Sequence, residues 1–343
     1  MKKKLVCFGL VVLMALTVFA ACGSKEEAAV NTQGGSALPG EGEVYCVVTS
    51  LHQLEFFDAL KAGVNAAADD IGATWYVAGP QEWIPDQISQ AIDQAVASKV
   101  TGIVLHGQSP ETGAAVDNAI KAGIPVVIVN TDIESDRLSF IGCNPYQAGF
   151  DMGKMMADMI GGSGKVIVST AISAGQPSAL ANLQGAKDAM SEYPSIEVVE
   201  VDDTSDANIA ATNIGAALQA NPDVVGIIGQ QAYTGVGAAT AVREAGLQGK
   251  ITIISRDRDA ATLELIESGE IAASYAQNSY VEGYIALQWL HAYINGKLKV
   301  INDYIGGGVN PLPNVVDSGS IVITKDNAAQ FKEKYVYKVT ASN

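Results

Sequence analysis

The sequence predicts an α/β protein of two Rossmann-like lobes, each a parallel sheet flanked by helices. Three observations carry this prediction. From residue 44 onward, short apolar runs alternate with longer amphipathic segments, as is typical of parallel sheets whose strands are joined by crossover helices. Part of this alternation occurs twice along the chain. In both copies polar residues directly follow the apolar runs, at the strand ends where open parallel sheets bind ligands.

The first series of elements begins with a run of β-forming residues at 44–49. Apolar residues then recur at helical spacing as far as Ile71. Gly123 directly follows a helix predicted over 111–122, as a left-handed C-cap residue commonly does. The other predicted elements of this series are strands at 74–78, 102–105 and 125–129 and a helix at 85–98.

A second series starts after Asn144 and keeps the same alternation. Its predicted helices are 145–160, 178–192, 206–220, 232–245 and 259–268. Its predicted strands are 165–169, 196–201, 224–228, 251–254 and 271–276.

The two series repeat each other in part. Residues 102–108 lead through a helix to a second apolar run that ends in Asn130-Thr131-Asp132. Residues 225–230 lead in the same way to a run that ends in Arg256-Asp257. Two similar lobes in tandem are the simplest explanation.

The N-terminus has the layout of a secretory signal peptide over residues 1–21. Three lysines precede an apolar run that ends at Phe19 and is short for a membrane span. The step Phe19-Ala20-Ala21-Cys22 resembles the lipobox of bacterial lipoproteins, which implies a lipid on Cys22; the alternative is an ordinary signal peptide with an incidental cysteine. Residues 22–43 are poor in apolar side chains and are predicted to form a flexible tether.

Charge, cysteine and histidine content argue against several kinds of binding site. Without residues 1–21 the chain keeps 18 of its 21 Lys and Arg against 37 Asp and Glu, a balance that opposes binding to nucleic acid or anionic lipid headgroups. Cys46 and Cys143 lie in apolar contexts that favour free buried thiols over a disulfide. Three histidines without metal-ligand spacing predict no metal site, and we expect no cofactor.

The residues after the strands form a set suited to a polyol. Carboxylates and amides bridge neighbouring hydroxyls, and an aromatic face packs on the C–H face of a sugar ring. Alternatives remain for three of them: Phe57 fits core packing, Asp257 fits a helix cap, and His106 fits a solvated loop. The candidate ligand residues from this argument are Phe56, Phe57, His106, Asn130, Asp132, Gln231, Arg256, Asp257 and Gln277.

Several segments in this order resemble the ribose-binding-protein group of type I periplasmic solute-binding proteins: Phe56-Phe57, residues 123–132, Phe140-Ile141-Gly142, and residues 271–277. The resemblance spans about residues 44–302. It implies two lobes joined by a three-crossover hinge, sugar in the cleft between them, and delivery to an ABC permease and its ATPase. By similarity, Asn130, Gln231, Asp257 and Gln277 contact the sugar.

The chain departs from that group at two positions. Thr131 and Asn182 stand where the ribose binder has arginines, so ribose held in that manner is not expected, although Asn182 remains a candidate ligand residue. The tail at 319–327 looks more like the rhamnose and autoinducer-2 binders. The resemblance places crossovers near 142–144, 277–278 and 302–306. It therefore implies an N-terminal lobe of residues 44–142 plus 279–303 and a C-terminal lobe of residues 143–278 plus 304–343.

These observations predict the extracytoplasmic, lipid-anchored, monomeric binding component of an ABC importer for a small sugar or polyol. One alternative is a subunit that presents its ligand to a membrane receptor kinase, with the same fold and site. The other is an extracellular α/β enzyme, against which residues 171–175 lack the leading glycine of a hydrolase elbow and residues 161–165 precede a strand rather than a helix. We expect no catalytic residues.

Overall fold

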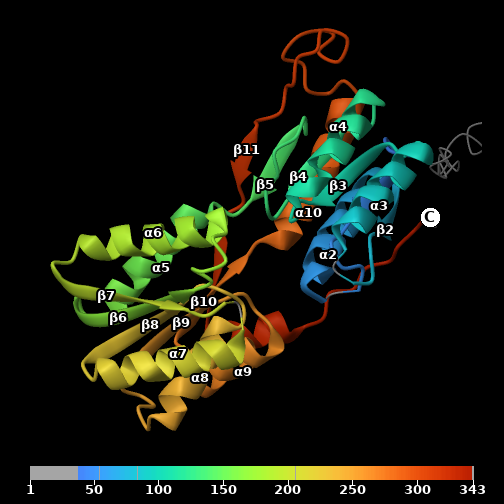
Figure 1. Cartoon of the computed structure of the whole chain (residues 1–343). Coiled ribbons are helices and arrows are strands. Elements are labelled where there is room, and N and C mark those ends of the chain that lie inside the picture. Colours follow the sequence, from blue (N-terminus) through green and yellow to red (C-terminus); the bar gives the residue numbers. More distant parts are fainter. Residues whose placement is uncertain (1–37, 54, 83, 205, 342–343) are drawn as a thin grey trace, which may run out of the picture. The chain divides into compact units, whose positions relative to one another are not determined.

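The structure is a computed structural model that describes residues 38–53, 55–82, 84–204 and 206–341 (Figure 1). Residues Pro39–Asn343 form one compact unit. The predicted signal peptide, Cys22 and most of the predicted tether lie outside the described residues. The body from Pro39 onward contains two six-stranded sheets, which confirms the predicted pair of α/β lobes.

The first lobe is built on a sheet of strand order β11-β5-β4-β3-β1-β2, parallel throughout. Its strands are β1 (Val44–Val48), β2 (Thr74–Ala78), β3 (Gly102–His106), β4 (Val126–Val129), β5 (Ser139–Gly142) and β11 (Val315–Asp317). In β1, next to the edge strand β2, Cys46 pairs with Tyr76 on one side and Ile103 on the other. All of β3 is buried, as expected for a strand covered on both faces.

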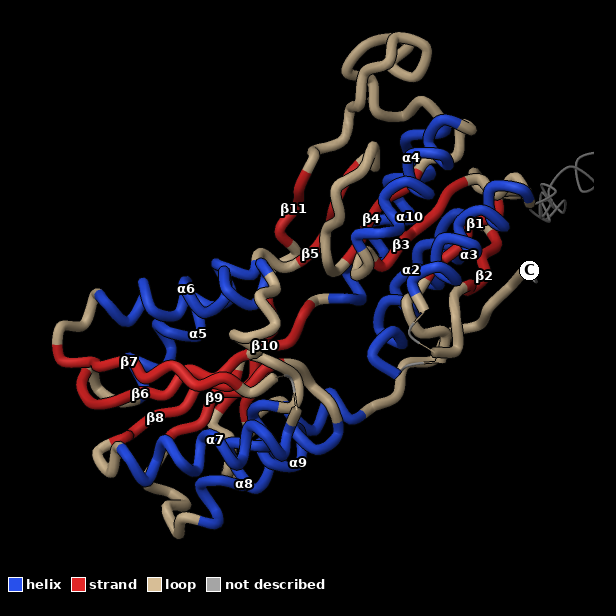
Figure 2. The backbone as a smooth tube through the Cα atoms, viewed as in Figure 1, coloured by secondary structure: helices blue, strands red, loops and turns tan. Residues whose placement is uncertain are grey.

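Helices cover both faces of this first sheet (Figure 2). One core joins β1 to α2 and α10, and a second core joins the opposite face to α3 and α4. The elements are η1 (Glu55–Phe57), α2 (Asp58–Ile71), α3 (Pro85–Ala97), η2 (Pro110–Thr112), α4 (Gly113–Lys121) and α10 (Ser279–Ile294), where η marks a 3-10 helix.

The second lobe has the strand order β12-β10-β9-β8-β6-β7, parallel except for the edge strand β12. Its strands are β6 (Ser163–Thr170), β7 (Ser195–Asp202), β8 (Val224–Gly229), β9 (Thr252–Arg256), β10 (Ala273–Gln277) and β12 (Ser320–Thr324). Its helices are α5 (Pro145–Met159), α6 (Pro177–Ser191), α7 (Ala207–Ala220), α8 (Thr234–Glu244), α9 (Ala260–Ser268) and η3 (Ala328–Lys332). The pair α5 and α6 covers one face, and α7, α8 and α9 cover the other.

Three crossovers join the lobes, as predicted. They run from β5 to α5, from β10 to α10, and from β11 to β12. The third crossover, however, lies at residues 318–319 and not near 302–306. The Asn310 amide donates to the carbonyl of Leu138, and Ser139 Oγ donates to the carbonyl of Pro313, which holds this segment on the first lobe.

The predicted domain boundaries therefore need correction at both ends. Residues 304–317 belong to the first lobe, because β11 extends its sheet beside β5. The last residues return to the first lobe as well, since the backbone N–H groups of Thr340 and Ala341 donate to the carbonyl of Trp75. At the start, Gly40 donates to the carbonyl of Ile71 and Glu43 accepts from His291, so the predicted tether ends before residue 40.

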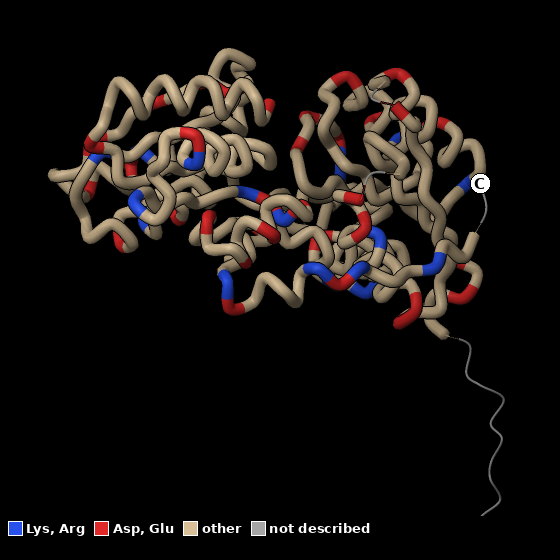
Figure 3. Tube along the Cα trace, turned by 90° about the horizontal axis from the view of Figure 1, so that it is seen from below, with Lys and Arg blue, Asp and Glu red and all other residues tan. Residues whose placement is uncertain are grey.

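Acidic positions are spread over both lobes with basic ones between them (Figure 3). Cys46 and Cys143 are free, buried thiols, as the sequence predicted. Within the described ranges, no helix combines the length and apolar character needed to cross a bilayer. The same ranges contain no cluster of side chains suited to a metal ion.

Candidate functional site

Asn130 and Asp257 occupy matching positions in the two lobes. Asn130 follows β4 and Asp257 follows β9, and both have a left-handed backbone, with φ of 70° and 64°. Each backbone N–H donates to the next strand of its sheet, Asn130 to the carbonyl of Ile141 at 3.0 Å and Asp257 to that of Tyr275 at 2.9 Å. Asn and Asp adopt this conformation more readily than other L-residues. The sequence repeat is thus also a repeat of backbone geometry at the strand ends.

The side chain of Asn130 connects the two lobes. Its Nδ2 donates to Oε1 of Gln277, the last residue of β10, at 2.5 Å. Its Oδ1 lies 3.1 Å from His106 Nε2 and accepts from Thr131 Oγ1 at 3.2 Å. Because an amide oxygen only accepts, His106 Nε2 carries the proton. Three predicted residues, His106, Asn130 and Gln277, therefore form one hydrogen-bonded chain.

His106 is buried beside the aromatic pair Phe56-Phe57. The His106 and Phe57 rings meet edge to face at 4.7 Å between centroids, and Phe56 lies 5.2 Å from Phe57. Burial lowers the pKa of His106 to about 4, so its imidazole is neutral at physiological pH. Its Nδ1 is buried without a hydrogen-bond partner in the described structure. The solvated-loop alternative for His106 is therefore wrong.

The two phenylalanines have different environments. Phe57 is 2% exposed and belongs to the core of the first lobe, whereas Phe56 is 38% exposed. Both lie in η1, which aims one ring inward and the other outward. Phe56 is the ring that a solute can reach.

Asp257 does not cap the helix that follows it. Asp259 does, because its Oδ1 accepts from the backbone N–H of Thr262 at 3.1 Å and its Oδ2 from the Thr262 hydroxyl at 2.7 Å. Burial raises the pKa of Asp257, and the neighbouring Arg256 opposes this shift. Nη1 of Arg256 is buried without a hydrogen-bond partner among the described residues. The second lobe therefore has the ionisable pair Arg256 and Asp257 at the strand end where the first lobe has the amide of Asn130.

Gln231 and Asn182 lie in the second lobe in different settings. Gln231 Nε2 donates to Thr170 Oγ1 at the end of β6, at 3.2 Å. Thr170 is not among the candidate ligand residues predicted from the sequence. Asn182 is 4% exposed on α6, and its backbone carbonyl accepts from Gln230 Nε2 at 3.0 Å. The side-chain oxygens of Asn182 and Gln230 are buried without partners in the described structure. Such atoms cost about 1–3 kcal/mol each when left unpaired.

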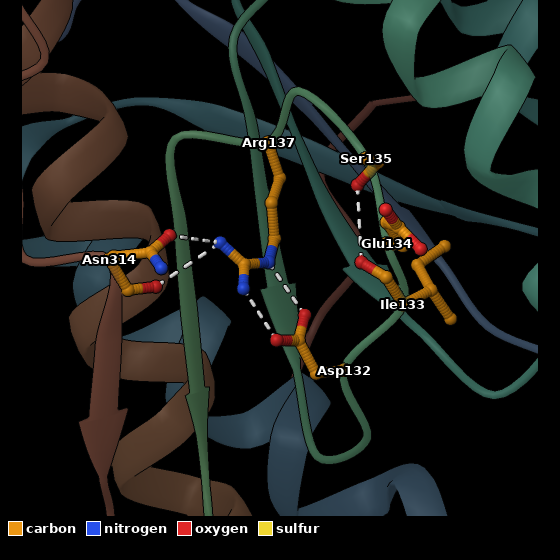
Figure 4. A pocket seen from close by; sticks show the side chains of 6 residues that line it. All are labelled: Asp132, Ile133, Glu134, Ser135, Arg137 and Asn314. Atoms are coloured by element: carbon orange, nitrogen blue, oxygen red, sulfur yellow. Dashed lines mark hydrogen bonds and ion pairs between the residues drawn. The ribbon is translucent and has the colours of Figure 1, made fainter.

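Asp132 forms a salt bridge with Arg137 of the same chain. Arg137 Nε and Nη2 donate to its two carboxylate oxygens at 2.6 and 2.5 Å, and Arg137 Nη1 donates to Asn314 Oδ1 at 2.7 Å (Figure 4). This ties the loop between β4 and β5 to the segment before β11. A hollow of about 440 Å³ at this point is lined by Asp132, Ile133, Glu134, Ser135, Arg137 and Asn314. Contact between Asp132 and a ligand stays a prediction.

Comparison with known proteins gives one consistent family. A family model described as a periplasmic binding protein domain matches residues 45–298. The D-apiose import binding protein of Actinobacillus succinogenes is 24% identical over 273 residues, which cover 78% of this chain and 86% of that protein. The xylitol-binding protein of Mycolicibacterium smegmatis is 27% identical over 256 residues, which cover 73% and 72%.

Solved structures agree with these sequence matches. A sugar-binding protein of a sugar ABC transporter from Bacillus halodurans superposes with a TM-score of 0.79 and 29% identity, over 84% of this chain and all of that one. An arabinose-binding protein from Geobacillus stearothermophilus gives the same TM-score and identity over 85% of this chain and 99% of its own. The two-lobed architecture is common to all three chains.

Proposed function

As this chain belongs to the periplasmic binding protein family, we propose that it captures a small sugar or polyol outside the cytoplasm and delivers it to an ABC importer. The observation that carries the proposal is the pair Asn130 and Asp257, set in the same backbone conformation at the strand ends of the two lobes. An amide offers both donors and an acceptor, and a carboxylate offers strong acceptors. Together they complement the neighbouring hydroxyls of a polyol.

The surrounding side chains support the same class of ligand. Phe56 is an exposed ring at the first-lobe edge, and aromatic faces pack well on the apolar face of a sugar. His106, held neutral by burial, orients the Asn130 amide without adding a charge. Gln231 and Gln277 offer further amides. Relatives named for D-apiose, xylitol and D-allose point to ligands of this chemistry and size.

We further propose that the ligand acts by holding the lobes together. A solute that contacts both Asn130 and Asp257 gains contacts only when the lobes approach, so it favours that arrangement by its differential affinity. The three crossovers supply the hinge, and the Asn130–Gln277 hydrogen bond lies beside one of them. The permease then recognises the loaded arrangement. No chemical step is part of this role, and we assign the chain no catalytic residue.

The N-terminal features fit a receptor held at a membrane. We propose that residues 1–21 are removed and that Cys22 receives a lipid, as its resemblance to a lipobox implies. The compact unit that carries both lobes begins at Pro39. Attachment would hold a monomeric receptor near its permease and so raise its effective concentration there.

A thermal-shift screen tests the proposal. Xylitol, D-arabinose, D-allose, D-apiose and D-tagatose are compared with amino acids and nucleosides as ligands of the full chain. A carbohydrate at a thousandfold excess over its dissociation constant stabilises the folded state by about 4 kcal/mol and raises the melting temperature. Asp257→Ala should abolish that shift, whereas Asp93→Ala, at an exposed position of α3, should keep it. A shift with amino acids alone would contradict the proposal.

A further inference from the structure

The last residues of the chain form a strap between the lobes, defined here as residues 333–341. Before it, η3 belongs to the second lobe, where Ala328 is fully buried and Lys332 pairs with Glu267 of α9. After η3 the chain leaves this lobe, passes α2, and ends beside β2 of the first lobe (Figure 1). It is a fourth connection between the lobes, in addition to the three crossovers.

The strap is fixed to the second lobe through Tyr335. The guanidinium of Arg258 lies 4.8 Å from the centre of the Tyr335 ring, and Arg258 Nη1 lies 3.1 Å from the Tyr335 hydroxyl oxygen as a hydrogen-bond donor. Such a cation–π contact is attractive because the guanidinium faces the electron-rich side of the ring. The Tyr335 ring also stacks on Tyr280 of the first-lobe helix α10, so Tyr335 itself contacts both lobes. Arg258 directly follows Asp257, so this anchor lies on the loop that carries a proposed ligand residue.

The strap is fixed to the first lobe through Tyr337. Its hydroxyl donates to Asp58 Oδ1 at 2.8 Å, and Asp58 directly follows Phe57. Three residues later Thr340 pairs with edge strand β2: Trp75 N–H donates to Thr340 Oγ1 at 3.0 Å, and Thr340 N–H donates to the Trp75 carbonyl at 3.1 Å. This second anchor lies on the turn that carries the exposed Phe56.

Very little chain separates the two anchors. Only Val336 stands between Tyr335 and Tyr337, and it is 93% exposed. Two residues span at most about 7 Å even when fully extended. A movement that separates the Asp257 loop from the Phe56 turn by more than the side chains can follow must therefore break one anchor.

We propose that Tyr335 and Tyr337 are positioning residues that hold the Asp257 loop and the Phe56 turn near the relative placement at which one ligand contacts both. This rests on the proposed function for its effect on binding, although the restraint itself does not. A restrained pair of loops loses less conformational freedom when a ligand joins them, so the strap strengthens binding without touching the ligand.

The test compares the double variant Tyr335→Ala/Tyr337→Ala with Val336→Ala as the matched control, in the full chain. Small-angle scattering without ligand reports the lobe arrangement. The double variant should show an increased radius of gyration, and Val336→Ala should match the unchanged protein. Calorimetry with D-arabinose, xylitol and D-allose then reports affinity, which the double variant should lower about fivefold or more.

Each result decides the matter. Unchanged scattering and affinity in the double variant, or tighter binding, would overturn the inference. Should none of the three ligands bind the unchanged protein, the proposed function is in question, while scattering still decides whether the strap restrains the lobes. Should the double variant fail to fold, Tyr337→Phe takes its place, because it removes only the hydroxyl that donates to Asp58; it should weaken binding by a smaller factor, and no change would again count against the strap.

Discussion

Each lobe contains a closely packed pair of helices, and the two pairs have the same glycine contacts but different neighbouring side chains. In the first lobe, a Cβ on Gly63 would lie 1.9 Å from the carbonyl oxygen of Tyr280, and one on Gly283 would lie 2.3 Å from that of Leu60. In the second lobe, Gly185 stands in the same relation to Tyr146, at 2.0 Å, and Gly149 to Asn182, at 1.9 Å. The pair α2–α10 thus corresponds to α6–α5.

This correspondence identifies where the lobes diverge. Leu60 in the first lobe matches Asn182 in the second, and Ala148 in the second matches Glu282 in the first. Both polar members are buried, at 4% and 0% exposure. The glycine contacts are therefore common architecture, whereas the buried polar groups are particular to one lobe each. Substitutions at these positions separate the two kinds of role.

The largest effect is expected at the shared glycines. Gly63→Ala and Gly185→Ala each place a methyl group against a backbone carbonyl that cannot move without displacing its helix. We expect each to lower the free energy of unfolding by about 3 kcal/mol or more in urea denaturation. Gly215→Ala is the control, because apart from its chain neighbours and the backbone of its own helix, no atom of the described structure lies within 4 Å of the added Cβ; it should stabilise α7 by about 1 kcal/mol. Equal effects at Gly63 and Gly215 would refute the close-packing account.

Glu282 gives the first lobe a pH dependence that the second lacks at the matching Ala148. Its Oε1 accepts from Ser318 Oγ at the third crossover, at 2.8 Å, and burial raises its pKa to about 7. The folded protein therefore binds a proton that the unfolded chain releases between about pH 4.5 and 7, so stability falls as the pH rises through this window.

Glu282→Gln removes this titration. Relative to the unchanged protein, its free energy of unfolding should rise from pH 5 to pH 8 by up to about 3 kcal/mol. Urea denaturation at the two pH values measures the difference, with the exposed Glu41→Gln as the control. A difference between variant and unchanged protein that does not vary with pH would contradict the account.

Exchanging the chemistry of the strand-end pair gives an intermediate effect. Asp257→Asn removes an ionisable acceptor and should weaken binding of the sugar found in the thermal-shift screen about 10- to 100-fold. Asn130→Asp removes the donor to Gln277 and places a carboxylate beside His106 Nε2, so the pKa of His106 should rise from about 4. Calorimetry measures the first effect and NMR titration of the imidazole the second; an unchanged imidazole titration would show that the His106–Asn130 contact is not formed in solution.

The smallest effect is expected at Asn182. Asn182→Leu copies the first-lobe residue Leu60 into the second lobe. It removes a buried oxygen that has no partner in the described structure, a gain of about 1–3 kcal/mol. It also inserts a larger side chain, at a cost of about 1–3 kcal/mol, so the two effects on stability largely cancel. Since Asn182 is buried between α5 and α6, we expect the affinity for the same sugar to change less than about twofold. A tenfold loss in calorimetry would instead make Asn182 a ligand residue, as its place among the candidate ligand residues predicted.

What the sequence predicted well is local. Apolar periodicity located β9 and the polar pair after it, and the internal repeat matched Asn130 with Asp257. The sequence also contains the signal that excludes Asp257 as the helix cap, because Asp259 stands directly before α9 with Thr262 three residues later. The sequence did not predict which way the Phe56 ring points, since this depends on the rotation of the three-residue helix η1.

What the sequence missed depends on distant partners. Strand β11 has only three residues and is defined by its pairing with β5, about 175 positions earlier. Tyr335 and Tyr337 alternate with exposed residues in the strap, but their anchors join residues 77 and 279 positions apart. Neither composition nor spacing indicates such contacts, because they arise only once the two sheets exist.

The left-handed backbone at residues 130 and 257 limits how this receptor can be retargeted to another solute. Branched and bulky side chains are strained at positive φ, which leaves asparagine, aspartate and glycine as the practical choices at these two sites. Diversity for a new cargo is better introduced at Phe56, Gln231 and Gln277, where no such backbone restriction applies.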